Sequence, residues 1–135
     1  MRALNALFAE AFAEPESYPA DAPDDAYVAR LLERPEVILL IAEQDGAAVG
    51  ALGAYELVKF EQARSEIYIY DLAVAEPFRR RGIATRLIAA TRAIARQVGA
   101  WTVFIQADLE DQAPAALYRK LASDEITALH FDIAP

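Results

Sequence analysis

The chain has 135 residues, a length that predicts a single domain large enough to bury a core. It has no cysteine and one histidine, which excludes disulfides, thiolate zinc sites, cysteine nucleophiles and multi-histidine metal sites. Its 21 acidic and 13 basic residues give a formal net charge of −8, which argues against general nucleic-acid binding and is compatible with a cationic partner.

The N-terminus predicts no secretory signal, because Asn5 and Glu10 interrupt its short apolar run. No stretch of the sequence reaches the ~18–20 apolar residues that cross a membrane. We therefore expect a soluble, cytoplasmic protein with no membrane partner.

Two helices are expected first. Apolar residues recur at helical spacing from Leu4 to Phe12, and Asp24 could cap a second helix. The expected buried face of that second helix consists of Tyr27, Val28, Leu31 and Leu32.

Three strands follow the two helices. Branched and aromatic runs predict these strands over 37–42, 48–60 and 67–74. The sequence Gln44-Asp45-Gly46 predicts a hairpin turn between the first two. Gly50 and Gly53 leave room in the second strand for a bulge or a close neighbour.

The second half of the chain alternates helices and strands. We expect a loop at 78–82, a helix ending at Gly99, a strand over 101–107 and an acidic loop over 108–111. A helix through Leu117 and Leu121 and a last strand over 126–133 complete the chain. This order predicts an α/β (α+β) fold class, in which helices cover the faces of one mixed sheet within a single domain of residues 1–135.

The passage from the third strand into the next helix suggests an anion site. Its loop reads Arg79-Arg80-Arg81-Gly82-Ile83-Ala84. A helix N-terminus offers unpaired backbone N–H groups, small residues let a phosphate approach, and arginines add forked donors. The passage is neither a P-loop nor a dinucleotide fingerprint. From this chemistry alone, an ordinary basic loop before a helix explains the passage equally well.

Two motifs resemble those of the GNAT acetyltransferase superfamily. The loop at 79–84, coming after Leu72-Ala73-Val74, is similar to its acetyl-CoA signature, and residues 111–121 are similar to its second motif. Residues 59–74, 106–108 and 130–133 resemble the aminoglycoside 3-N-acetyltransferases of the gentamicin-resistance type, and this similarity covers nearly the whole chain.

The chain departs from these families at four places. Members usually begin with a strand before the first helix, so either the sheet lacks an edge strand or the sequence is shortened. The segment from Ser123 to Leu129 is one residue longer than in relatives. Ala122 stands where the second motif has glycine, and Asp111 stands where the wider superfamily often has asparagine.

The resemblance implies an activity and a cosubstrate. It implies N-acetylation of aminoglycoside antibiotics at the 3-amino group, giving resistance, by direct attack of the amine on acetyl-CoA without a metal. The pyrophosphate would lie on the backbone of Arg81, Gly82, Ile83, Ala84 and Thr85. The pantetheine arm would pair with Leu72, Ala73 and Val74, with the Val74 N–H near the thioester carbonyl. The family also implies a homodimer.

Two residues are expected to move protons. Asp71 interrupts an apolar strand, where a carboxylate is costly unless it faces a cleft or a partner, and we expect it to act as the base. The alternative is a structural aspartate that bonds a neighbouring loop. Tyr118 stands at the motif tyrosine and is expected to protonate the departing thiolate. Its spacing from Leu117 and Leu121 is equally that of a tyrosine packed on the core.

The acceptor is expected to meet Tyr70, Asp71 and the acidic loop residues Asp108, Glu110 and Asp111. Carboxylates there could pair with the ammonium groups of a polycationic sugar, or they could form a solvated loop that caps the next helix. Glu66 and Asp132 are weaker candidates, and His130 is expected to be structural. The alternatives to an aminoglycoside enzyme are acetylation of another amine, such as a polyamine or a peptide N-terminus, and a non-catalytic acetyl-CoA-binding module.

Overall fold

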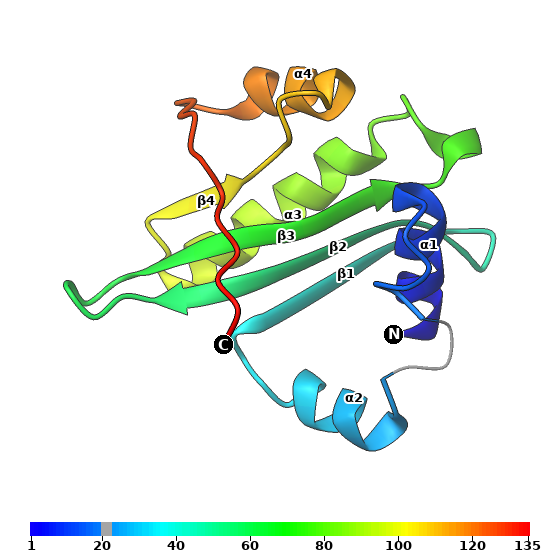
Figure 1. The fold of residues 1–135 in the computed structure, drawn as a ribbon, viewed down its shortest axis with the longest axis horizontal. Helices are drawn as coiled ribbons and strands as arrows, with labels where there is room; N and C mark the ends of the chain where they lie inside the picture. Colours follow the sequence, from blue (N-terminus) through cyan, green and yellow to red (C-terminus); the bar gives the residue numbers. More distant parts are fainter. Residues whose placement is uncertain (20–22) are drawn as a thin grey trace.

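The computed structural model describes residues 1–19 and 23–135 (Figure 1). The four strands of these residues form one mixed sheet in the order β1-β2-β3-β4, in which β1, β2 and β3 are antiparallel and β4 is parallel to β3. The elements are α1 (Arg2–Phe12), α2 (Asp25–Leu32), β1 (Val37–Gln44), β2 (Ala47–Val58), β3 (Ser65–Val74), the 3₁₀ turn η1 (Glu76–Phe78), α3 (Ile83–Val98), β4 (Thr102–Ile105) and α4 (Gln112–Leu121). The predicted α/β class with a mixed sheet is confirmed, and no strand precedes α1 among the described residues.

Helices cover both faces of the sheet (Figure 1). Helix α3 packs on one face over a core that includes Leu52, Ile67 and Ile69. Helix α1 packs on the other face, which we call the α1 face, where Phe8 is 1% exposed and contacts a cluster with Ala51 and Ala73. The apolar spacing of α1 and α3 therefore gives each helix one buried side, as the sequence predicts.

The glycines of the β1–β2 hairpin have the roles expected of them. The turn places Asp45 and Gly46 at φ of 53° and 80°, the left-handed values that a two-residue hairpin requires. A Cβ added at Gly50 would lie 2.7 Å from Ile83 Cγ2, so α3 approaches β2 closely at this point. The pairing of β2 with β3 shifts register between Gly53 and Ala54, which confirms the predicted bulge.

That bulge determines which way Asp71 faces. Gly53 pairs with Asp71 and Ala54 pairs with Ile69, so Tyr70 is an extra residue in β3. Ile69 and Leu72 consequently both lie in the α3 core, while Asp71 faces the α1 side together with Ala73. If Tyr70 were instead paired in a regular ladder without a bulge, strict alternation would place Asp71 on the same face as Ile67 and Ile69.

Helix α2 differs from the prediction. Asp24 caps it as expected, accepting a hydrogen bond from the Tyr27 backbone N–H at 2.7 Å. Its predicted buried face is wrong, because none of its residues is buried, and Tyr27 and Leu32 are 49% and 61% exposed. The helix lies beyond the β1 edge of the sheet (Figure 1), so its apolar side is only partly covered, at Val28 and Leu31.

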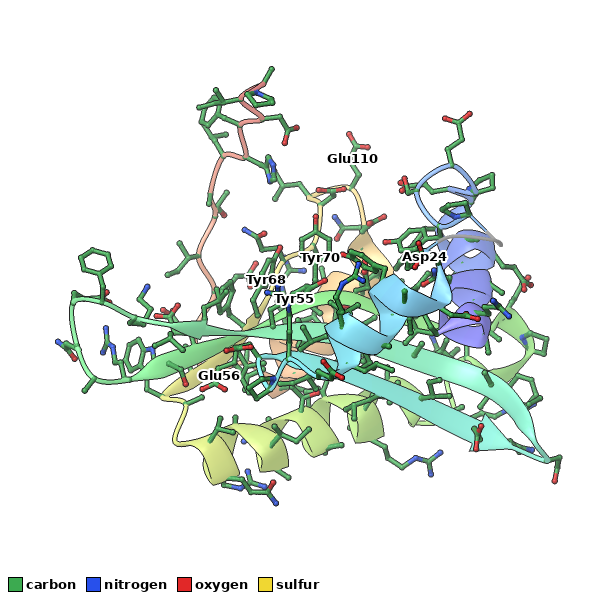
Figure 2. The ribbon with its side chains drawn as sticks, turned by 90° about the horizontal axis from the view of Figure 1, so that it is seen from below. Asp24, Tyr55, Glu56, Tyr68, Tyr70 and Glu110 are labelled. Carbon is green, nitrogen blue, oxygen red and sulfur yellow. The ribbon has the colours of Figure 1, made fainter. Side chains whose placement is uncertain are left out.

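The predicted last strand over 126–133 is also wrong for the isolated chain. Residues 122–135, which we call the tail, form no helix or strand, and every one of them is exposed. Figure 1 shows the tail in red crossing in front of the sheet, and Figure 2, turned by 90°, shows it standing away from the sheet. Within residues 1–19 and 23–135 no strand pairs with it, so its backbone joins no ladder.

Candidate active site

A cleft opens where β3 and β4 separate. The two strands pair only from Glu66–Thr102 to Ile69–Ile105, so in the described residues the β4 side of β3 has no strand partner beyond Ile69. The cleft at this place has a volume of about 410 Å³ and is open to solvent. Its lining includes four of the predicted site residues together with Ile105 of β4, namely Tyr70, Leu72, Asp111, Tyr118 and Ile105. The structure thus brings residues of β3, β4 and α4 to one hollow.

Asp71 lies beside this cleft on the α1 face, half-buried. Its carboxylate accepts a hydrogen bond from the Tyr18 hydroxyl, with 2.7 Å between Tyr18 Oη and Asp71 Oδ1. Burial raises the pKa of Asp71, the Tyr18 hydrogen bond lowers it, and the charge of Glu14 raises it slightly. The result is a carboxylate with a raised pKa, which makes it a stronger base than an exposed aspartate.

Sequence reasoning missed Tyr18. The residue lies in the loop after α1, 53 positions before its partner, and its ring packs against Phe8 and Phe12 with centroids 5.5 and 5.8 Å away. Burial and the neighbouring Asp71 both raise the pKa of Tyr18, so its hydroxyl stays protonated as the donor. No local sequence pattern identifies such a residue, because the contact depends on how α1 crosses the sheet.

Tyrosine rings form a floor next to Asp71. Tyr70 meets Tyr68 and Tyr55 edge-to-face, with ring centroids 5.5 and 6.1 Å apart. Figure 2 shows the three rings grouped on the α1 face, with Glu110 on a loop above them in that view. Burial raises the pKa of Tyr55, and the charge of Asp71 adds to the rise. These three side chains, which we call the tyrosine floor, offer flat, partly apolar surfaces with hydroxyl ends.

Tyr118 lines the cleft from α4 and packs against the α3 core at the same time. Tyr118 therefore has both the position in the cleft that a proton donor needs and the packing of a core tyrosine. Burial raises its pKa first, and the negative charge of Asp111 raises it further. Its hydroxyl is consequently protonated near neutral pH and can donate a proton within the cleft.

The N-terminus of α3 is open, as an anion site requires. Gly82 is the N-cap with φ of 77°, and no side chain caps the helix, so the first backbone N–H groups have no partner there. No atom lies within 4 Å of the place where a Gly82 Cβ would be, so a ligand could approach the backbone. Arg80 is held at φ of 61°, an unfavourable conformation for a residue with a side chain.

Two arginines of this loop make contacts within the protein. Arg79 Nε donates to the Val74 carbonyl at 3.1 Å, which ties the loop to the end of β3. The Arg81 guanidinium lies over the Phe78 ring, 5.2 Å from its centroid. Both residues keep further N–H donors, so the open helix start, the basic loop and the free β3 edge fit a phosphate with an extended arm attached.

The acidic candidate residues lie in different places. Asp111 lines the cleft and occupies the N-cap position of α4, yet its side chain makes no cap hydrogen bond. Asp108 and Glu110 are exposed in the preceding loop and are not part of the cleft lining. Glu66 accepts a hydrogen bond from Trp101 and pairs with Lys59 at 3.6 Å, so its contacts are structural.

His130 and Asp132 are not part of the cleft lining. Asp132 pairs with His130 at 3.0 Å within the tail. In the part of the chain that the structure describes, no three His, Cys, Asp or Glu side chains come together in a way that could hold a metal ion. Over those same residues, no helix is both long and apolar enough to cross a membrane.

Comparison with known proteins identifies the family. The model described as the acetyltransferase (GNAT) family matches residues 2–122. The chain therefore belongs to the GNAT acetyltransferase family. A curated relative, an N-alpha-acetyltransferase of Sulfurisphaera tokodaii, is 27% identical over 122 residues, covering 85% of this chain and 70% of the relative.

Solved structures of aminoglycoside acetyltransferases resemble the whole chain. HMB0005, from an uncultured soil metagenomic sample, is 52% identical with a TM-score of 0.95, over 100% of this chain and 90% of that chain. Meta-AAC0020, also from soil, was solved in complex with sisomicin, and it is 28% identical with a TM-score of 0.81 over 98% and 87% of the chains. AAC(6′)-Iy, solved with CoA, shares the fold at 21% identity and a TM-score of 0.78, over 98% of this chain and 86% of that chain.

Proposed function

We propose that this chain transfers the acetyl group of acetyl-CoA to the 3-amino group of aminoglycosides and so confers resistance to antibiotics such as gentamicin. The observation that carries the proposal is a half-buried carboxylate, Asp71, held beside a cleft that opens at a free strand edge and reaches Tyr118. The full-length likeness to HMB0005 supports an aminoglycoside as the acceptor. Acetyl-CoA, when bound, supplies the acetyl group as a reactive thioester.

In this proposal the β3–α3 passage holds the donor. Backbone N–H groups at 82–85 and the guanidinium groups of Arg79, Arg80 and Arg81 face the pyrophosphate. The free edge of β3 over 72–74 pairs with the extended arm, because its N–H and C=O groups lack a strand on that side. These residues orient the thioester toward the cleft.

Asp71 and Tyr118 divide the proton transfers. Tyr18 occupies one side of the Asp71 carboxylate, and the remaining lone pairs take a proton from the acceptor ammonium, leaving the amine free to attack. Tyr118 gives its hydroxyl proton to the thiolate that leaves. Tyr70, Asp108, Glu110 and Asp111 hold the other ammonium groups of the acceptor, since a polycation favours aromatic faces and carboxylates.

The acceptor is tested with purified protein, acetyl-CoA and a panel of amines, by following thiol release. We expect release with gentamicin-type aminoglycosides, and NMR of the product should show the acetyl group on the 3-amino nitrogen. If only spermidine or a peptide supports release, the acceptor assignment fails. Binding of CoA with no transfer to any amine would favour the non-catalytic module.

The two proton-transfer residues are tested by Asp71→Asn and Tyr118→Phe. We expect each variant to lower kcat by about 10²–10⁴-fold, the usual contribution of a positioned acid or base, while calorimetry still detects CoA binding. Asp45→Asn, at the exposed β1–β2 turn, and Tyr27→Phe make the same chemical changes at exposed positions outside the cleft lining and should leave kcat unchanged. Equal kcat values for the site variants and these controls would contradict the proposed roles of both Asp71 and Tyr118.

Acetylation of a peptide N-terminus is the second candidate, favoured by the similarity to the N-alpha-acetyltransferase. For either acceptor, we propose one GNAT domain over residues 1–135 that acts in the cytoplasm as a homodimer. Its partner is a small-molecule or peptide amine, and it binds neither nucleic acid nor membrane.

A further inference from the structure

One polar residue of the cleft has no part in the proposed transfer. Gln106 is the first residue after β4 and lines the cleft at the point where β3 and β4 separate. The other polar side chains of the lining, those of Tyr70, Asp111 and Tyr118, can gain or lose a proton, whereas a carboxamide stays neutral. Gln106 can therefore contribute recognition to the cleft, and it cannot contribute proton transfer.

The register of the sheet explains where Gln106 lies. Tyr68 pairs with Phe104 in the parallel ladder, and Gln106 follows Phe104 by two positions, which is the spacing of residues on one face of a strand. The rings of Tyr68 and Phe104 stack, with centroids 4.7 Å apart and 5° between their planes. A diagonal neighbour of this kind is within reach of a long side chain, so the Tyr68 hydroxyl and Gln106 can meet.

Tyr68 holds the Gln106 carboxamide by its oxygen. The Tyr68 hydroxyl donates to Gln106 Oε1 across 2.6 Å. Burial raises the pKa of Tyr68, and the neighbouring Tyr70 and Asp71 raise it further, so the hydroxyl remains a donor near neutral pH. Within residues 1–19 and 23–135, Gln106 Nε2 meets no hydrogen-bond acceptor, so both of its N–H groups are available. The pair thus presents a fixed, neutral donor in the cleft lining.

A neutral N–H donor selects a different chemical group from the one that a carboxylate selects. Asp71 and Asp111 favour an ammonium group, which has donors only. The Gln106 N–H groups need a lone pair, which an ammonium lacks and a hydroxyl or ether oxygen supplies. The acceptor that satisfies both kinds of side chain at once is an amine that carries oxygen atoms near its nitrogen.

We propose that Gln106 Nε2 donates a hydrogen bond to a hydroxyl or ether oxygen of the acceptor, and that this contact selects hydroxylated amines over plain polyamines. The inference rests on the proposed function, because it names a further contact of the same acceptor. Tyr68 is a positioning residue, since it acts through Gln106 by fixing Oε1. The carboxylates attract the ammonium groups of either kind of amine, so the preference between the two depends on Gln106.

The test compares two amines that differ in their oxygen atoms, namely 2-deoxystreptamine and cis-1,3-diaminocyclohexane, which is the same ring without hydroxyl groups. NMR titration in the presence of CoA measures Kd for each amine and needs no turnover. The ratio of the two Kd values defines the preference of each variant, and any difference between the basicities of the amines cancels when variants are compared.

The first variant is Gln106→Met, which nearly preserves the shape of the side chain and removes the amide. We expect the preference for the hydroxylated ring to fall about tenfold, as for the loss of one hydrogen bond, while Kd for the plain diamine changes little. Gln97→Met makes the same change at an exposed position of α3 outside the cleft lining and should keep the natural preference.

The second variant, Tyr68→Phe, keeps the ring that stacks on Phe104 and removes the hydroxyl. We expect a partial loss of preference, about threefold, because the amide is no longer held in place. Adding Tyr68→Phe to Gln106→Met should cause no further loss, since the hydroxyl acts only through the amide. A merely structural role of Tyr68 would lower the affinity for both amines in either background.

An unchanged preference in Gln106→Met would overturn the inference, and so would an equal loss of affinity for the two amines. Because the readout is binding, a lost preference without acetyl transfer to any amine would contradict the proposed function and leave the role of Gln106 standing. Acetyl transfer with an unchanged preference would do the reverse.

Discussion

The Asp71 carboxylate is under two opposed influences. Removal from water favours its protonated form, while the hydroxyl of Tyr18 stabilises its ionised form. The loop after α1 therefore tunes a group on β3, and the balance between the two influences sets the pH at which Asp71 can accept a proton.

Removing the Tyr18 hydroxyl should shift the pH dependence of the reaction. In Tyr18→Phe the pKa of Asp71 rises further, so the acid limb of kcat moves to higher pH and the loss of activity is larger at pH 6 than at pH 8. The measurement is a kcat–pH profile with a saturating aminoglycoside, compared with Tyr27→Phe, which removes the hydroxyl of an exposed tyrosine and leaves the Tyr18–Asp71 hydrogen bond in place. A uniform loss at all pH values would mean that Tyr18 only supports the fold.

Asp71 should also make the protein less stable at neutral pH. Because its pKa in the folded state lies above the unfolded value of about 3.9, stability is greatest below that value and falls as pH rises through the folded pKa. We expect Asp71→Asn to be at least as stable as the natural protein at pH 7, with a difference that grows between pH 4 and pH 8. Urea unfolding at several pH values measures it. A difference that shrinks as pH rises would contradict the raised pKa.

At the scale of the elements, the two ends of α3 permit a matched comparison. Gly82 and Gly99 have φ of 77° and 75°, and neither has an atom within 4 Å of an added Cβ. Replacing either by alanine should cost about 1–2 kcal/mol of stability, the strain of a left-handed residue with a side chain. Only Gly82→Ala should also weaken CoA binding, which calorimetry measures. Equal CoA affinities in the two variants would contradict binding of the pyrophosphate at the start of α3.

Most elements could be predicted from sequence because their causes are local. The side of α1 and α3 that is buried follows from apolar spacing, and the β1–β2 turn follows from Asp45-Gly46, which accepts positive φ. The open start of α3 was visible in the same way, since Gly82 is the N-cap and has no side chain with which to cap.

The features that the sequence did not reveal depend on distant parts. The exposure of α2 depends on where the chain places it relative to the sheet edge, and the Tyr18–Asp71 contact joins residues 53 positions apart. The alternation of apolar residues in the tail predicts a strand, but a strand needs a neighbour to pair with, and no described strand pairs with the tail. Apolar periodicity predicts the conformation that a segment favours, and it does not identify the segment that pairs with it.

At the scale of the whole molecule, charge is unevenly distributed. Six of the 13 basic residues lie between Arg79 and Arg96, in the loop before α3 and in that helix, although the net charge is −8. The proposed acceptor residues at 71 and 108–111 are acidic. The loop before α3 and that helix are therefore basic within an acidic chain, which suits the proposed polyanionic donor and polycationic acceptor.

This distribution predicts a salt effect on the acceptor. Raising the ionic strength from 0.1 to 1 M shortens the screening length from about 10 to 3 Å. We expect KM for an aminoglycoside with several amino groups to rise about tenfold, and KM for an amine with one charge to change little. Initial rates across a salt series measure both values. Parallel changes for the two acceptors would show that the acidic loop does not contact the extra ammonium groups.

The extra residue in β3 has a consequence for how this protein can vary. Removing Tyr70 would leave Ile69 and Asp71 opposite the same partners in β2, on the same faces as before. The pairing of β2 with β3 therefore does not require a residue at position 70. The packing of the core does not determine which side chain occupies this position. A residue so placed, beside the proposed base and in the lining of the cleft, should accept substitutions that change the acceptor while the scaffold stays the same.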